Sequence, residues 1–296
     1  MTPRCLVIAG PTAAGKTAAS LAVARRFGAI VLSADAMAVY RTMDIGTAKP
    51  SVEERGDIPH EGIDVVDPDQ DFDAGDFVEL ADRVLAEHSR VVVVGGTHFY
   101  LRSMQRGLVD TPDVDPQLRA QVEGLEDLHA ELSLVDPELA ERLHANDRVR
   151  LVRGIEVFRA TGRKLSDMHR EHAAQPDRVS VWGLWFDRDD NDERIEARVQ
   201  IMLRAGYVAE VQGLLDRGYS RDLKPMQSLG YRHLCDHLID GLDLDEAARR
   251  TTRDTRRFAR KQRTWLRNLA YPKVATDHVE RALQAAAMLW EGAPSR

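Results

Sequence analysis

One eight-residue motif restricts the folds open to this chain more than any other feature. Its residues, in chain order, are Gly10, Pro11, Thr12, Ala13, Ala14, Gly15, Lys16 and Thr17, and they match the pattern G-x-x-x-x-G-K-[ST]. An apolar run at residues 5–9 precedes the motif, and a helical pattern at residues 16–27 follows it. In this setting the motif predicts a loop whose backbone N–H groups, with Lys16 and the amino end of the helix, bind phosphate. Thr17 is predicted to offer its hydroxyl to Mg²⁺.

The apolar runs predict a parallel sheet. Residues 5–9, 30–33 and 91–94 form short runs that are continuous rather than alternating, as expected for strands buried on both faces. A helical pattern at residues 16–27 separates the first two runs, and another at residues 74–87 precedes the third. We therefore predict an α/β fold, a P-loop NTPase-like parallel sheet flanked by helices, with ligands at the carboxyl ends of the strands.

An inserted helical segment interrupts this pattern. Between residues 113 and 176 the strand signal vanishes and apolar residues recur at helical spacing, with Pro112 and Pro176 marking the boundaries. Residues 179–186 then resemble a returning strand. The predicted organisation is a first part of the core at residues 1–112, an all-helical subdomain at 113–176, and a completed core with basic helices at 177–296.

Composition places the chain among ordinary globular proteins. Apolar residues make up 43% and charged residues 30% of its 296 residues, and no apolar run approaches the roughly 18 residues of a membrane span. Cys5 and Cys235 are too few for a disulfide framework and lack zinc-ligand spacing, so we expect them to pack in the core. We expect a cytosolic protein without a signal peptide.

The charge is unevenly distributed along the chain. The net charge is −7, which by itself argues weakly against a nucleic-acid partner. Between residues 249 and 267, however, nine basic residues face a single acid, Asp254. Six arginines there follow alternating spacings of four and three residues, which predicts one stripe along a helix that contacts nucleic acid; they are Arg249, Arg253, Arg256, Arg260, Arg263 and Arg267.

The ends of the other predicted strands bear on the chemistry. NTP-hydrolysing proteins usually carry an acidic residue for Mg²⁺ at the end of a second strand, whereas residues 91–94 lead into Gly95-Gly96-Thr97. ATP hydrolysis is therefore disfavoured. Asp35 follows the strand at residues 30–33, and its carboxylate either holds a substrate, takes a proton, or caps a helix that begins at Ala36.

A series of further motifs resembles one known family. The series comprises residues 10–17, 44–50 (Asp-Ile-Gly-Thr-Ala-Lys-Pro), 59–60 (Pro-His), 95–97, 146–148 (Asn-Asp-Arg), 230–232 (Gly-Tyr-Arg) and 255–267. In this order the motifs closely resemble the bacterial tRNA dimethylallyltransferases, also called tRNA isopentenyltransferases. The resemblance runs from about residue 3 to residue 269. Residues 44–50 have no chemistry that spacing alone reveals.

The resemblance implies a reaction and a set of residues. The family transfers a dimethylallyl group from its diphosphate to the exocyclic amine of the adenosine 3′ of the anticodon, with Mg²⁺, and its members are monomers. Residues 12–17 would contact dimethylallyl diphosphate, and the whole loop would grip the diphosphate leaving group. Asp35 would be the base that deprotonates the amine, with Thr12 and Arg198 as further catalytic residues. From the sequence alone, Arg198 also fits a solvated helix face.

The resemblance also implies contacts with the anticodon stem-loop of tRNA. The matching positions are Asp35, Ala36, Met37, Ala38, Thr97, Arg119, Val149, Arg150, Leu151, Val152, Arg153, Gln227, Ser228, Leu229, Gly230, Tyr231 and Arg232, to which the stripe adds Arg256 and Arg260. The target adenine stacks in the loop and must swing out to reach Asp35. Tyr40, Tyr100 or Tyr231 would receive the base or else pack in the core.

Two departures from the family pattern leave alternatives open. The family commonly carries serine and glutamine where this chain has Ala36 and Ala38, and a smaller apolar pair where it has His98 and Phe99. The changes at residues 36–38 leave open a tRNA-binding relative that has lost catalysis, although the chain retains Lys16, Thr17, Asp35 and Arg198, which argues against it. A small-molecule kinase would use the same loop with Asp35 activating a hydroxyl, but it needs neither the arginine stripe nor residues 44–50. A prenyltransferase acting on free adenylate would likewise have no use for the stripe.

Overall fold

The computed structural model describes residues 4–113 and 115–292, so residues 1–3, 114 and 293–296 of the predicted ranges lie outside the described residues. The chain divides into two compact units, one formed by both ends of the chain and one formed by Arg106–Asp177. The second unit begins seven residues before the predicted position 113 and ends one residue after 176. Pro112 is the seventh residue of this unit, because the chain leaves the first unit where helix α4 (His98–Arg106) ends.

A six-stranded, all-parallel sheet forms the centre of the first unit, in the order β3-β2-β4-β1-β5-β6. The strands are β1 Cys5–Ala9, β2 Ile30–Ser33, β3 His60–Glu61, β4 Val91–Gly95, β5 Val181–Phe186 and β6 Lys273–Val274. The predicted strands at residues 5–9, 30–33, 91–94 and 179–186 are confirmed as β1, β2, β4 and β5. Strands β3 and β6 are two residues long and leave no periodic signal in the sequence.

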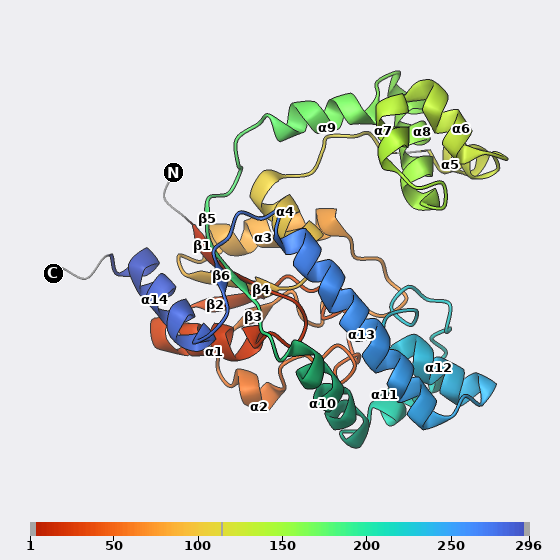
Figure 1. Cartoon of the computed structure of the whole chain (residues 1–296). Coiled ribbons are helices and arrows are strands. Elements are labelled where there is room, and N and C mark those ends of the chain that lie inside the picture. Colours follow the sequence, from red (N-terminus) through yellow and green to blue (C-terminus); the bar gives the residue numbers. More distant parts are fainter. Residues whose placement is uncertain (1–3, 114, 293–296) are drawn as a thin grey trace. The chain divides into compact units, whose positions relative to one another are not determined.

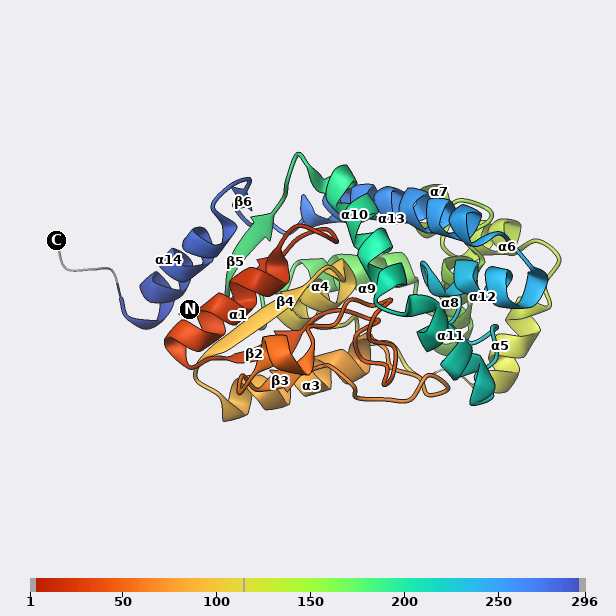
Figure 2. The same ribbon diagram turned by 90° about the horizontal axis from the view of Figure 1, so that it is seen from below.

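Helices cover both faces of the sheet, as Figure 1 shows. Alternate residues of a strand point to opposite faces, so Cys5 and Val7 of β1 join one hydrophobic cluster while Leu6 and Ile8 join another. The first cluster includes α3 (Ala74–Glu87) and α4, and the second includes α1 (Lys16–Phe27) and α14 (His278–Trp290). Helices α1 and α14 lie side by side in both views (Figures 1 and 2).

Five further helices belong to the first unit: α2 Val52–Arg55, α10 Asn191–Arg204, α11 Tyr207–Asp216, α12 Tyr231–Asp240 and α13 Leu244–Leu266. Helix α13, at 23 residues, packs against both α10 and α12. Asp243 caps its amino end by accepting a hydrogen bond from the Glu246 N–H group at 3.0 Å. This long helix carries the predicted arginine stripe.

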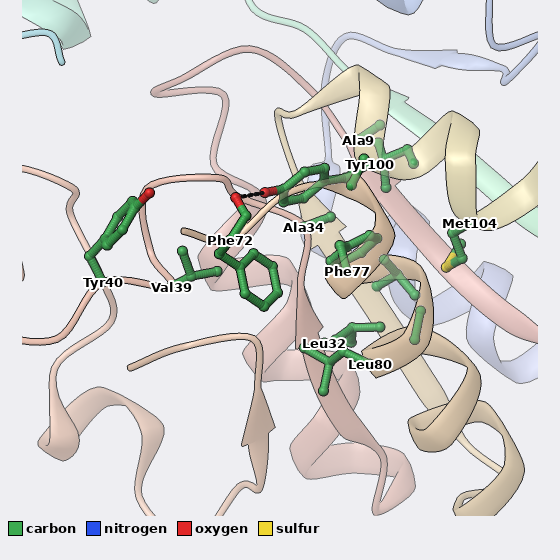
Figure 3. Close-up of a cluster of buried hydrophobic side chains, with 14 of the residues drawn as sticks. Ala9, Leu32, Ala34, Val39, Tyr40, Phe72, Phe77, Leu80, Tyr100 and Met104 are labelled. Atoms are coloured by element: carbon green, nitrogen blue, oxygen red, sulfur yellow. Dashed lines mark hydrogen bonds between the residues drawn. The ribbon is translucent and has the colours of Figure 1, made fainter. Parts of the chain in front are cut away.

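Two of the tyrosines considered as receptors for the base lie in the core. Tyr40 is 2% exposed and Tyr100 is 5% exposed. The Tyr100 ring stacks on Phe77 with 4.5 Å between centroids, and its hydroxyl donates to the Phe72 carbonyl at 3.5 Å (Figure 3). These contacts settle the choice for Tyr40 and Tyr100 in favour of packing. Cys5 and Cys235 are also buried and unbridged, as predicted, and burial raises the pKa of the Cys5 thiol to about 12.

The second unit contains only helices among its described residues. They are α5 Pro116–Glu123, α6 Leu128–Val135, α7 Pro137–Arg142, α8 Arg148–Thr161 and α9 Leu165–Ala173. Their apolar faces meet in a separate core that includes Leu132, Leu151 and Ile155. Across the described parts of both units, no helix is long and apolar enough to cross a membrane.

Candidate active site

The main cavity of the first unit, about 690 Å³ in volume, lies at the carboxyl ends of β1, β2 and β4. It brings together predicted residues from distant parts of the chain, namely Thr12, Lys16, Thr17, Asp35, Ala36, Met37, Ala38, Thr97, Arg198, Gln227, Ser228, Leu229, Tyr231 and Arg232. Helix α10 contributes Arg198 and the apolar residues Ile195, Val199 and Met202 to the wall. The cavity therefore combines a polar end at the phosphate-binding motif with an apolar stretch along α10.

The phosphate-binding motif forms the loop between β1 and α1. Gly15 adopts a left-handed conformation with φ of 89°, which a residue without a side chain reaches at little cost, and it caps the amino end of α1. No side chain accepts a hydrogen bond at this cap. Its N–H groups thus stay available to an anion, as the motif predicts. The Lys16 ammonium donates to the Pro11 carbonyl at 2.8 Å, and the Ala13 carbonyl accepts from Arg194 Nε at 3.0 Å.

The cations Lys16 and Arg198, beside the phosphate-binding loop, lack an ion partner among the described residues. Among the described residues, no carboxylate oxygen lies within 4.0 Å of the Lys16 ammonium or the Arg198 guanidinium. Burial lowers the pKa of Lys16 to about 8, an effect that Asp35 opposes and Arg198 reinforces. Burial also lowers the pKa of Arg198 from its ordinary value. Both cations are therefore destabilised until an anion enters the cavity.

Asp35 lies directly after β2, where the sequence analysis placed it. Its Oδ1 atom accepts the Met37 N–H group at 2.9 Å, and residues 36–39 form turns rather than a helix. The Ala36 N–H group donates to Thr97 Oγ1 at 3.0 Å. The first bond orients the carboxylate in the cavity wall, and the second fixes the backbone next to it. Asp35 stabilises a turn and does not cap a helix.

Glu210 of α11 explains residues 44–50, for which the sequence offered no chemistry. Its carboxylate accepts the N–H groups of Asp44, Ile45 and Gly46 at 2.9, 2.7 and 3.1 Å, and the Tyr231 hydroxyl at 2.6 Å. The carboxylate thus fastens two segments of the cavity wall, residues 44–50 and the start of α12. The Tyr231 ring is 1% exposed, so it packs and supports this wall.

Lys49 fastens residues 44–50 at their other end. Its side chain is 3% exposed, and its ammonium donates to Asp44 at 2.8 Å and to Asp64 at 2.7 Å. It also donates to the Tyr40 carbonyl. The Lys49 side chain is therefore structural, and neighbouring residues of the segment line the cavity.

The side of α13 that faces the cavity is not the predicted stripe. Arg257, Phe258, Lys261 and Gln262 line the cavity, together with Asp254. Asp254 accepts Arg232 Nη2 at 2.6 Å and Arg253 Nε at 2.9 Å, and these bonds lower its pKa to about 2. An ionised Asp254 thus orients Arg232 at the cavity.

Asp254 is the one acid within residues 249–267, but it is not the only acid that faces the stripe in the folded chain. Acids from α10 and from the end of β5 face it in the folded chain. Arg256 pairs with Glu196 at 2.7 Å, and Arg260 lies 3.8 Å from Asp192. The Arg263 guanidinium contacts Asp187 at 2.7 Å, with both side chains largely buried. Part of the stripe therefore attaches α13 to its neighbours, and tRNA contact by Arg256 and Arg260 stays a prediction.

The predicted tRNA residues of the second unit divide by burial. Val149 and Arg150 of α8 are exposed, at 82% for Val149 and 71% for the Arg150 side chain. Leu151 and Val152 are buried in the core of the unit, and their contact with tRNA stays a prediction. Helical periodicity turns them inward while their neighbours face out.

Two arginines of this unit lie close to a fully buried acid. Arg119 forms two hydrogen bonds with Glu156, at 2.7 and 3.2 Å. Arg153 lies 3.8 Å from the same carboxylate and donates to the Thr111 hydroxyl at 2.6 Å. Both guanidinium groups are thereby oriented while their side chains remain 53% and 35% exposed.

Of the two departures from the family pattern, one lies in the cavity wall and the other does not. Ala36, Met37 and Ala38 line the cavity, whereas His98 and Phe99 are not among its lining residues. The small side chains of Ala36 and Ala38 therefore leave the cavity wall apolar at these points. The sequence analysis did not single out Glu210, and it assigned no role to Lys49 and Gln262, which lie within the motifs at residues 44–50 and 255–267.

Comparisons of the sequence give consistent matches. The model of the family described as IPP transferase matches residues 38–269, and that of the family described as isopentenyl transferase matches residues 3–59. The tRNA dimethylallyltransferase 1 of Syntrophotalea carbinolica is 48% identical over 275 residues, covering 89% of this chain and 88% of the relative. The tRNA dimethylallyltransferase of Geobacter metallireducens is 46% identical, covering 89% of each chain.

Solved structures agree with these matches. The tRNA isopentenylpyrophosphate transferase of Bacillus halodurans has a TM-score of 0.71 and 32% identity, covering 98% of this chain and 97% of that chain. A eukaryotic dimethylallyltransferase acting on tRNA has a TM-score of 0.84 and 23% identity, covering 100% of this chain and 81% of that chain. The second likeness is one of fold.

Proposed function

Because the chain belongs to the IPP transferase family, we propose that it prenylates tRNA. In the proposed reaction a dimethylallyl group passes from dimethylallyl diphosphate to the exocyclic amine of the adenosine 3′-adjacent to the anticodon, and diphosphate is released. One observation carries the proposal beyond the family. The cavity holds a phosphate-binding loop, the Lys16 and Arg198 cations, which have no ion partner among the described residues, and the Asp35 carboxylate.

The loop side of the cavity suits a diphosphate leaving group. Negative charge develops on the diphosphate as the allylic C–O bond breaks. Positive potential to stabilise it comes from Lys16, from Arg198 and from the amino end of α1, which no side chain caps. The electrons of that bond leave with the diphosphate. Thr12 lies in the same loop and lines the cavity, and we expect its side chain to contact the leaving group. No nucleotide hydrolysis is required.

Asp35 supports the acceptor side of the reaction. As the new N–C bond forms, the amine must lose a proton, and the Asp35 carboxylate is the acidic group beside Lys16 in the cavity. A positioned general base contributes about 10² to 10⁴ in rate. The apolar residues Ile195, Val199 and Met202 of α10 give the dimethylallyl group a dry surface.

The residues of the loop fit Mg²⁺. The Thr17 side chain is exposed to the cavity, and no group of three or more His, Cys, Asp or Glu residues among the described residues forms a metal cage. Mg²⁺ is commonly held by few protein oxygens and by substrate phosphates. Thr17 would hold the ion, which would supply charge neutralisation for the diphosphate when bound.

Residues from both units are proposed to contact the tRNA. In the first unit these are Thr97, residues 227–232, Arg257 and Lys261 at the cavity, with Arg256 and Arg260 on the neighbouring side of α13. In the second unit they are Arg119, Val149, Arg150 and Arg153. We propose that the protein acts as a monomer in the cytoplasm.

Nucleoside mass spectrometry tests the function directly. Unmodified tRNA is incubated with the purified protein, Mg²⁺ and dimethylallyl diphosphate, with Asp35→Asn protein as the control. A dimethylallyl mass gain on the adenosine beside the anticodon, absent from the control, is expected. Tight tRNA binding without any gain would point instead to a relative that has lost catalysis. Transfer to free adenylate but not to tRNA would indicate the other prenyltransferase class.

A further inference from the structure

A buried amide links the phosphate-binding loop to helix α13. The Gln262 side chain is 4% exposed, and its Oε1 atom accepts the Thr12 N–H group at 2.9 Å. Its Nε2 atom donates to the Gly96 carbonyl at 3.0 Å. The two partners lie 250 and 166 residues away in the sequence. Both ends of the amide are therefore used to join three segments of the cavity.

The surroundings fix the orientation of this amide. Rotating it by 180° would place its oxygen against the Gly96 carbonyl and its NH₂ group against the Thr12 N–H group, which loses both bonds. A Cβ atom at Gly96 would lie only 2.3 Å from Gln262 Nε2 and 3.1 Å from the Gly10 carbonyl oxygen. Only glycine at position 96 lets the amide approach this closely.

The same turn continues to the general base. Thr97 follows Gly96, and its Oγ1 atom accepts the Ala36 N–H group at 3.0 Å, next to Asp35. The Thr97 N–H group donates to the Ala34 carbonyl at 3.2 Å, on the other side of Asp35. A continuous chain of bonds thus runs from the phosphate loop through Gln262 and residues 96–97 to both neighbours of Asp35.

We infer that Gln262 is a positioning residue that sets the phosphate-binding loop relative to Asp35. The inference rests on the proposed function for the identity of the ligand, dimethylallyl diphosphate. Gln262 acts through the Thr12 backbone: by holding this N–H group, it fixes the course of the loop that grips the leaving group. Through Gly96 it fixes the segment that carries the base.

Position matters here because the reaction needs three groups in one geometry. The leaving group, the attacking amine and the base must be aligned within a fraction of an ångström, and a displacement of 1 Å can cost about 10²-fold in rate. Losing the amide removes the partner of the half-buried Thr12 N–H group and of the buried Gly96 carbonyl. The loop would then shift to satisfy them.

Two variants of the full-length protein test the inference. Gln262→Met keeps the size of the side chain and removes both hydrogen bonds, whereas Gly96→Ala leaves Gln262 in place but displaces its amide. Tyr271→Phe is the matched control, because it removes a 2.9 Å bond to Gln105, also 166 residues away, that does not reach the phosphate-binding loop. Thermal unfolding gives the loss of stability for each protein.

Calorimetric titration with inorganic diphosphate and Mg²⁺ is the first readout. Gln262→Met and Gly96→Ala are each expected to weaken diphosphate binding about tenfold or more, and to raise the KM for dimethylallyl diphosphate more than the KM for tRNA. Tyr271→Phe should bind diphosphate as the wild type does, even where its loss of stability is similar.

The outcomes separate this inference from the proposed function. Diphosphate affinity unchanged in both variants would overturn the role of Gln262, as would an equal weakening in Tyr271→Phe. A wild-type protein that binds diphosphate but prenylates no tRNA would refute the proposed function while the comparison of variants stays valid. A wild-type protein that does not bind diphosphate would overturn both.

Discussion

Replacing Lys16 by methionine tests two effects of this residue separately: its contribution to diphosphate binding and its effect on the stability of the fold. The ammonium group lines the cavity near Arg198 without a carboxylate within 4.0 Å in the described residues, and burial lowers its pKa from 10.5 to about 8. The folded protein thus disfavours the charged form that phosphate binding needs. Methionine keeps much of the apolar side chain and removes the charge.

The pKa of Lys16 gives the size of the effect. A pKa about 2.5 below its unfolded value corresponds to roughly 3 kcal/mol against the charged form, at 1.36 kcal/mol for each pH unit. Solvent in the open cavity screens part of this penalty, so we expect about 2 kcal/mol. Between pH 8 and 10.5 the unfolded chain binds the proton more tightly than the folded chain. The stability of the wild type therefore rises with pH across this window.

Urea unfolding followed by tryptophan fluorescence measures this difference. All four tryptophans lie in the first unit, at Trp182, Trp185, Trp265 and Trp290. At pH 7 Lys16→Met should be about 2 kcal/mol more stable than the wild type, with the gap closing toward pH 10.5, and it should lose diphosphate binding. A variant that is less stable than the wild type at pH 7 would refute the reasoning, since it would show that the folded protein stabilises the charge.

Three other substitutions test separate parts of the site. Asp35→Asn should lower turnover by about 10² to 10⁴ with tRNA affinity nearly unchanged, as single-turnover and filter-binding assays would show; a comparable loss of affinity would make Asp35 a binding group. Glu210→Gln should lose about 2 to 3 kcal/mol of stability, because the amide cannot accept all four bonds that the carboxylate accepts, and wild-type urea stability would exclude this role. Lys261→Glu should weaken tRNA binding and flatten its salt dependence, because Lys261 lines the cavity without an ion partner among the described residues, whereas Arg256→Glu, whose guanidinium already pairs with Glu196, should do so by a smaller factor; equal salt slopes would count against this ranking.

The parts of the fold that sequence predicted share one property: their signals are local. The apolar runs became β1, β2, β4 and β5, and the helical patterns at residues 16–27 and 74–87 match α1 and α3. Strands β3 and β6 were not predicted, because a segment of two residues shows no periodic pattern. They are defined by their hydrogen bonds to the neighbouring strands β2 and β5. Helix α14 was also missed in a tail without a clear pattern.

The chemistry of the site divides in the same way. The phosphate-binding loop and Asp35 follow directly from short motifs at the ends of strands. The spacing of basic residues in α13 revealed a stripe, but not that acids of α10 face it or that Arg257 and Lys261 line the cavity. A helix has several faces, and sequence spacing does not tell which face its neighbours cover.

By itself, then, the sequence determined the parallel sheet, the phosphate-binding loop, the position of Asp35 and the family, because each is written in contiguous residues or in motifs of fixed order. Tertiary structure alone decided the roles of Glu210 and Gln262, and which arginines are paired. The sequence around a glutamate or glutamine in a predicted helix does not indicate which groups its side chain will bond. The Gln262 amide acquires its role only when folding brings Thr12 and Gly96, 250 and 166 residues away, within hydrogen-bonding distance.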